Sequence, residues 1–155
     1  MGRATASITV PGLASDAEAL WYDSTRWASW IDGFGHVVEL SDGWPAEGTL
    51  QWNSLPEGRG RVLEVVKAYE PRAGQTLEVE DSRLRGRQRV EFKPGHDEVE
   101  IALTLDYELK EQHPLTWLVD ALFVRREIAA SLRRTLARFA VERRGDMEWE
   151  PEESR

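Results

Sequence analysis

The stretch EVEIALTLDYEL, from Glu98 to Leu109, carries the clearest structural signal in this sequence. Every second residue of it is apolar: Val99, Ile101, Leu103, Leu105, Tyr107 and Leu109. Because side chains alternate between the two faces of a β-strand, this pattern predicts a strand with one buried face and one face in water. Such alternation is typical of antiparallel sheets.

The residues after this strand predict a long helix that begins near Pro114 and continues to about Arg144. At helical spacing, one side of it gathers apolar residues, which predicts the face that packs on the sheet: Leu118, Leu122, Ala129, Leu132, Leu136 and Ala140. Arg125 falls on the same side. A buried cation needs a carboxylate, a ligand or water, so Arg125 is either a polar anchor for a ligand or an arginine whose stem covers apolar surface while its head reaches solvent.

The residues before the strand predict a meander of further antiparallel strands. Turn signals such as Asp42-Gly43, Pro56-Glu57-Gly58 and Pro94-Gly95 separate short runs rich in valine, leucine and aromatic residues. An alternating run from Ala4 to Val10 adds one strand at the start of the chain. In total, we expect about seven strands.

Two short helices are expected between the first strand and the meander. Ser15 and Glu18 have the spacing of a capping box, and Ser24 or Thr25 can cap the second helix. The two helices contain three of the seven tryptophans of the chain: Trp21, Trp27 and Trp30. A tryptophan buries a large apolar area and carries one N–H group, so this cluster is either core packing or the wall of a ligand site. Of the three, Trp30 is the one expected to touch a cavity as well.

The composition narrows the classes of function. A chain of 155 residues fits one domain, expected at residues 1–144, followed by an acidic and disordered tail at 145–155. The formal net charge of −8 disfavours nucleic-acid partners. No apolar run is long enough to span a membrane, and the N-terminus lacks the pattern of a signal peptide. We therefore expect a cytoplasmic protein, either a monomer or a homodimer.

Metal and cofactor motifs are absent from the sequence. There is no cysteine, and the three histidines show no metal-ligand spacing, so neither a metal nor a cofactor is expected. His36 shares its strand parity with Phe34 and is expected in the core or at a cavity rim. The stretch GRGR, Gly58 to Arg61, is not followed by a helix and is interpreted as a hairpin turn rather than a phosphate-binding loop.

The order of these elements is that of a known α+β family. The supporting residues are Val10-Pro11 before Ala17 to Trp21, Trp27 and Trp30 before a glycine-containing strand, Gly48 at a strand start, and Glu70-Pro71-Arg72 before Leu77. The chain resembles the START-like (SRPBCC) superfamily, which includes polyketide cyclases and lipid-transfer START domains. The resemblance implies the helix-grip fold: a curved antiparallel sheet wrapped around a long C-terminal helix, with a large, mostly apolar ligand cavity between them.

Six residues are the candidate ligand-binding set: Trp30, Trp52, Glu64, Gln88, Tyr107 and Arg125. Glu64 is the natural partner for Arg125, although both faces of its strand are nearly equally apolar and leave its orientation open. Trp52 lines the cavity only if Leu50 also points inward; the alternative register would place Gln51 and Asn53 there.

The leading hypothesis is the binding of a hydrophobic small molecule, a lipid, a polyketide or an aromatic metabolite, in the internal cavity. One alternative is a polyketide aromatase/cyclase-like enzyme in which Arg125, Tyr107 and Gln88 polarise carbonyl groups. A second alternative is a protein-interaction module of the same fold, which would have a filled cavity and an exposed apolar patch.

Overall fold

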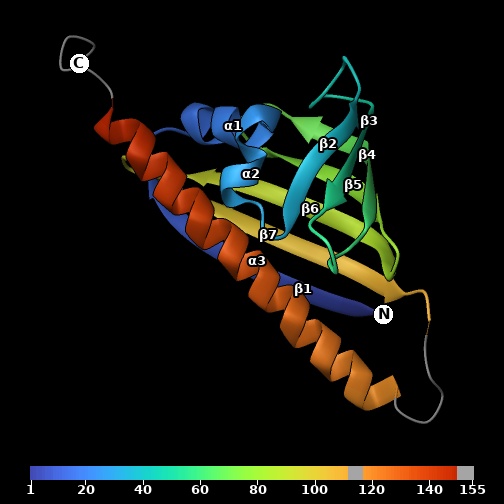
Figure 1. Ribbon diagram of the computed structural model, residues 1–155. Helices are drawn as coiled ribbons and strands as arrows, with labels where there is room; N and C mark the ends of the chain where they lie inside the picture. The colour runs from blue at the N-terminus through green and yellow to red at the C-terminus, as the bar shows by residue number, and fades with distance from the viewer. Residues whose placement is uncertain (112–116, 150–155) are drawn as a thin grey trace.

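The computed structural model describes residues 1–111 and 117–149 and consists of one seven-stranded antiparallel sheet, two short helices and one long helix (Figure 1). In chain order the elements are β1 (Gly2–Pro11), α1 (Ala14–Tyr22), a 3-10 turn (Ser24–Arg26), α2 (Trp27–Trp30), β2 (Phe34–Leu40), β3 (Thr49–Ser54), β4 (Arg61–Glu70), β5 (Gly74–Glu80), β6 (Leu84–Pro94), β7 (Glu98–Leu109) and α3 (Trp117–Glu148). The expected α+β helix-grip architecture is confirmed. Among the described residues, no helix combines the length and the apolar character needed to cross a bilayer.

The sheet has the strand order β1-β7-β6-β5-β4-β3-β2, so the first strand of the chain pairs with the last, and β1 and β2 are the edge strands. β7 lies between β1 and β6, and Ile101 is paired with Ile8 on one side and with Phe92 on the other. The apolar face that the sequence predicts for β7 is buried from Val99 to Tyr107. The core therefore forms where this face meets α1, α2 and α3.

The two short helices are present, but their caps differ from the expected ones. Leu13 is the N-cap of α1 and makes no side-chain capping bond, because leucine has no polar side-chain group, and the expected cap Ser15 lies inside the first turn. The Glu18 carboxylate instead accepts a hydrogen bond from the backbone N–H of Arg72, at 2.6 Å. Asp23 caps the 3-10 turn by accepting from the backbone N–H of Thr25, at 3.0 Å. The predicted capping box is therefore wrong, although the helix that it indicated exists.

The long helix α3 packs against the core from about Val124 onward and is buried most deeply from Leu132 to Ala140. Leu136, Phe139 and Ala140 are fully buried, whereas Leu118 and Leu122 are more than half exposed. In Figure 1 the first turns of α3 extend past the sheet, beyond the end that carries the N-terminus. The prediction of a buried stripe is wrong for these turns because no strand lies beneath them.

The C-terminal end of α3 differs from its predicted position. The helix continues to Glu148, so residues 145–148, expected in the disordered tail, are helical. Pro114, the expected start of the helix, and residues 150–155 lie outside the described residues.

Candidate functional site

A cavity of about 80 Å³ lies between the sheet, the two short helices, the turn that follows α2, the β2–β3 connection and the middle of α3. Its lining combines five of the seven tryptophans with several polar side chains. The tryptophans are Trp21, Trp27, Trp30, Trp44 and Trp52, and the polar residues are Asp32, Arg59, Glu64, Gln75, Gln88, Ser131 and Thr135. Since a water molecule needs about 10–15 Å³ of such space, the cavity has room for a few waters or for one small chemical group.

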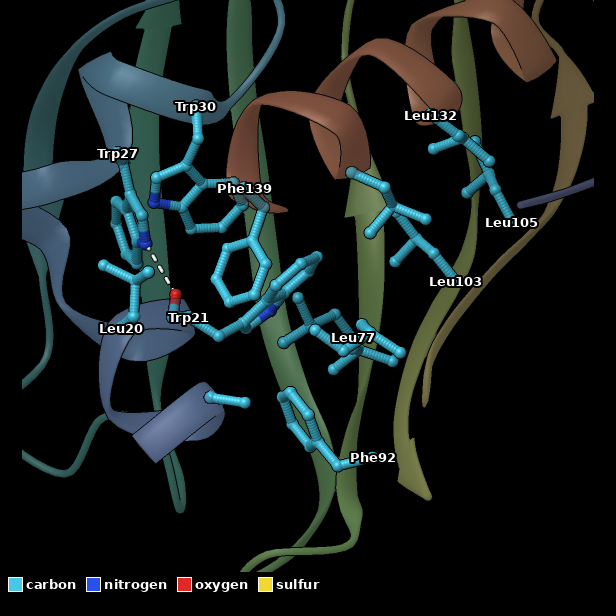
Figure 2. Packing of buried hydrophobic residues seen from close by; sticks show 14 of the residues in the cluster. Leu20, Trp21, Trp27, Trp30, Leu77, Phe92, Leu103, Leu105, Leu132 and Phe139 are labelled. Atoms are coloured by element: carbon cyan, nitrogen blue, oxygen red, sulfur yellow. Dashed lines mark hydrogen bonds between the residues drawn. The ribbon is translucent and has the colours of Figure 1, made fainter. Parts of the chain in front are cut away.

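The tryptophans form both the core and the cavity wall. The ring centroids of Trp21 and Trp30 are 4.7 Å apart, and that of Phe139 lies 5.1 Å from Trp30 (Figure 2). The indole N–H of Trp27 donates to the backbone carbonyl of Trp21 at 2.8 Å. The expectation that only Trp30 of this cluster touches the cavity is therefore too narrow. The indole N–H of Trp30 is buried and has no hydrogen-bond partner among the described residues.

Glu64 is a buried carboxyl group in the cavity wall. It lies on β4 opposite Leu50 of β3 and Val79 of β5, and only 7% of it is exposed. Burial raises the pKa of Glu64, while the positive charge of Arg59 and the indole N–H of Trp52 oppose this rise only in part. Within residues 1–111 and 117–149, no ion pair includes Glu64.

Arg59 is the cation whose charge lowers the pKa of Glu64, and its own side chain is held by Asp81 and Trp52. Its Nε donates to the Asp81 carboxylate at 2.7 Å, and its guanidinium carbon lies 5.4 Å from the centroid of the Trp52 ring. The Asp81 carboxylate is almost fully buried and also accepts from the backbone N–H groups of Arg83 and Leu84. Arg59 is thus fixed over Trp52 by the turn between β5 and β6.

Sequence reasoning missed Arg59, because the GRGR stretch was interpreted only as a turn. The stretch does lie at the connection between β3 and β4 and is followed by a strand and not by a helix, as expected. No periodic signal in the sequence points to Arg59, because its position depends on the pairing of Trp52 with Val62, which brings the β3–β4 connection back over the tryptophan. An arginine in that connection is within reach of the ring.

Asp32 joins the turn after α2 to α3 through five hydrogen bonds. Its carboxylate accepts from Ser131 Oγ at 2.7 Å, from Arg134 Nε and Nη2 at 3.1 and 2.9 Å, and from Arg138 Nη1 at 3.2 Å. Its backbone N–H donates to Thr135 Oγ1 at 3.0 Å. Burial by itself would raise the pKa of Asp32, but the hydrogen bonds from Arg134 and Ser131 and the charges of both arginines outweigh it and lower that pKa. We call these five residues the Asp32 latch; three of them line the cavity.

Four of the six candidate residues line this cavity: Trp30, Trp52, Glu64 and Gln88. The inward register of Trp52 is observed, and Gln51 and Asn53 lie on the other face, where they contact Arg61. Tyr107 and Arg125 are not among the lining residues. The Tyr107 ring is buried against the backbone of Gly2, at the edge of the sheet.

Arg125 is exposed on the first turns of α3 and does not line the cavity. Of its two interpretations, the ligand anchor in this cavity is therefore unsupported, and a head group that reaches solvent agrees with its exposure. The apolar side of α3 that includes Arg125 contacts the core only in the turns that follow Arg125, from Ala129 onward. Arg125 was expected to pair with Glu64, but the cation whose charge acts on the pKa of Glu64 is Arg59. In the described part of the chain, no group of three histidine, aspartate or glutamate side chains is arranged to hold a metal ion.

Comparison with known proteins identifies the fold independently. A family model described as polyketide cyclase/dehydrase and lipid transport matches residues 1–142. Among curated protein sequences, none matches the chain.

Solved structures with this fold share little sequence with the chain. The protein TTHA0849 from Thermus thermophilus superposes with a TM-score of 0.74 at 18% identity, covering 92% of this chain and 96% of that one. A START superfamily protein from Mycobacterium smegmatis gives 0.62 at 14%, covering 84% and 93%. Truncated norcoclaurine synthase from Thalictrum flavum gives 0.66 at 12%, covering 90% and 91%. Because the family model spans almost the whole chain and the fold agrees, this protein belongs to the polyketide cyclase/dehydrase and lipid transport family of the START-like (SRPBCC) superfamily.

Proposed function

We propose that this protein binds a small hydrophobic molecule in the cavity between the sheet and α3, with the polar end of that molecule at Glu64. The observation that carries the proposal is a buried carboxyl group in a tryptophan-lined cavity, without an ion pair among the described residues. Burying such a group opposes folding. Groups of this kind, with perturbed pKa values in a concave site, are typical of functional sites.

The lining supports an aromatic or aliphatic body with a polar end, among the lipid, polyketide and aromatic classes that the family description allows. Trp30 and Trp52 supply flat apolar walls, while Glu64, Gln88 and Arg59 supply hydrogen bonds. Pockets for drug-sized ligands measure about 300–1,000 Å³. A cavity of about 80 Å³ fits the end of such a ligand.

The test is a titration followed by the indole N–H signals in NMR spectra of ¹⁵N-labelled protein. Small aromatic alcohols, 2-phenylethanol and 2-naphthol, are expected to shift the signals of Trp30 and Trp52 in a saturable way. The signal of the exposed Trp149 should remain in place and serves as the internal reference.

A pair of variants on one strand locates the binding site. Gln88→Phe adds volume inside the cavity, whereas Arg87→Phe adds the same group on the outer face of β6. We expect the first to abolish the shifts and the second to preserve them. Saturable binding that survives Gln88→Phe unchanged, or no binding by the unaltered protein, would contradict the proposal.

Catalysis on the bound molecule is a second candidate, favoured specifically by Glu64. A carboxyl group with a raised pKa in a cavity is suited to exchange a proton with a ligand carbonyl, and Arg59 lies where it can stabilise negative charge. Of the three residues first assigned to carbonyl polarisation, only Gln88 lines the cavity. If the protein is a cyclase, Glu64→Gln should retain ligand binding and lose turnover of a poly-β-keto substrate; unchanged turnover would exclude this role.

A further inference from the structure

The charges around the cavity leave one negative group without a partner, and this identifies the class of ligand, given the ligand-binding function proposed above. Arg59 and Asp81 neutralise one another at 2.7 Å. At the rim, Asp32 is matched by Arg134 and Arg138, whose side chains are half exposed. Among the charged residues that line the cavity, Glu64 alone has no ion pair within the described part of the chain. The charge of Arg59 acts on it, but Arg59 is already paired with Asp81, so a cationic ligand would supply the direct partner that an ionised Glu64 lacks.

The tryptophan rings favour the same kind of ligand. The face of an indole ring carries a negative electrostatic potential and attracts cations, more strongly than the faces of phenylalanine or tyrosine. Five indoles line the cavity. The guanidinium of Arg59, 5.4 Å from the Trp52 centroid, already has this arrangement inside the protein. Aromatic walls with one carboxylate are the chemistry with which proteins recognise organic ammonium ions.

The size of the cavity agrees with an ammonium group rather than with a whole ligand. Its volume of about 80 Å³ accommodates a group of a few heavy atoms. An ammonium group at the end of an apolar chain meets this limit. It also presents N–H donors to the carboxylate oxygens of Glu64, which are the acceptors that the cavity offers at that point.

We propose that the cavity binds the ammonium group of a primary organic amine, with Glu64 as its ion-pair partner and the tryptophan rings as its walls. The apolar body of the amine packs against the tryptophan rings that line the cavity. The net charge of −8 on the chain favours the approach of such a cation over that of an anion.

Three probes that share a phenyl ring and differ in charge test the proposal. They are 2-phenylethylamine, which is a cation at neutral pH, 2-phenylethanol and phenylacetate. Titrations followed by the indole N–H signals should show that the cation binds at least about tenfold more tightly than the alcohol, and that phenylacetate binds most weakly. The side chains of Trp30 and Trp52 should report the binding.

Two glutamate variants separate the role of Glu64 from a general effect of charge. Glu64→Gln should weaken binding of 2-phenylethylamine about tenfold or more and change binding of 2-phenylethanol by less than about threefold. Glu78→Gln removes the same charge from the exposed outer face of β5 and should leave all three affinities unchanged. Dispersed indole signals in each variant establish that it is folded.

The outcomes distinguish this inference from the function on which it rests. If the alcohol binds as tightly as the amine, or if Glu64→Gln binds the amine as well as the unaltered protein does, the cavity binds ligands but the ammonium assignment is wrong. If phenylacetate binds most tightly, Arg59 is the anchor and the assignment is also wrong. If none of the three probes binds, both the ammonium assignment and the ligand-binding proposal are wrong.

Discussion

At the scale of single residues, Glu64 links stability to function. Burial raises its pKa above that of an unfolded chain, so the folded state holds the proton more tightly. Stability therefore falls as the pH rises from the unfolded pKa toward the folded one, and above that range the full penalty remains. Glu64→Gln removes the penalty. We expect it to raise the free energy of unfolding at pH 7.5 by about 1 kcal/mol or more, with the difference vanishing near pH 4.

Thermal and urea unfolding of both proteins at pH 4, 5.5 and 7.5 measure this difference. Glu78→Gln, on the outer face, is the control in which no such pH dependence should develop. A Glu64→Gln variant that is less stable at pH 7.5 would show instead that the ionised carboxyl is held by Arg59.

Substitutions of Trp30 measure how much a residue of the cavity wall contributes to the stability of the core. Only 1% of Trp30 is exposed, and its ring packs on Trp21 and Phe139. Trp30→Ala should therefore cost about 3–5 kcal/mol in the free energy of unfolding. Trp30→Phe keeps much of the packing and removes a buried N–H without a partner among the described residues, so its cost should stay below about 1.5 kcal/mol. Urea unfolding compares the two, and equal losses would mean that a phenyl ring cannot replace the packing of the larger indole ring.

At the scale of secondary-structure elements, the two halves of α3 should respond differently to the same substitution. Leu136, on the side of α3 that faces the sheet, is 1% exposed, whereas Leu122, on the first turns of the same helix, is 51% exposed. Leu136→Ala should lower the free energy of unfolding by about 2–5 kcal/mol, and Leu122→Ala should change it by less than about 0.5 kcal/mol. Because the residue type and the helix are the same, only packing differs. A large loss from Leu122→Ala in urea unfolding would mean that these turns are covered in solution.

The strand β2 is irregular, and its side chains therefore do not alternate between the two faces as the sequence pattern predicts. His36 shares sequence parity with the buried Phe34 and was expected in the core or at a rim. A register shift between these two residues turns His36 outward, where its ring lies 3.3 Å from the Asn53 side-chain amide. A second shift follows between Val37 and Glu39. Strand alternation fails at such bulges, since one extra residue reverses the side-chain direction.

At the scale of the whole molecule, the Asp32 latch fastens α3 to the turn after α2, and it joins residues about one hundred positions apart. Asp32→Ala should lower the free energy of unfolding by about 1–3 kcal/mol at pH 7, with the lower end favoured because both arginines are half exposed. The Asp32 pKa is lowered in the folded state, so its contribution is present above the unfolded pKa and is lost as the pH falls through the folded one.

Urea midpoints of Asp32→Ala and the unaltered protein at pH 7 and pH 3 measure the strength of the latch. The gap between them should be wide at pH 7 and narrow at pH 3. Asp42→Ala changes an exposed aspartate in the β2–β3 connection and should leave both midpoints unchanged. An equal gap at both values of pH would assign the effect to packing rather than to the charge of Asp32.

The sequence by itself determined the elements of this protein and their order, because periodicity and turn residues are local properties. The alternation from Val99 to Tyr107 and the predicted apolar stripe of α3 from Leu132 onward are found buried where the pattern puts them. Only the tertiary structure decided where α3 leaves the sheet, which exposes Arg125, and which cation acts on Glu64. Arg59 reaches the cavity through the pairing of β3 with β4 and through Asp81, from a turn that carries no periodic signal. A site built from side chains that meet across strands depends on register and on element length, and neither is contained in a local pattern.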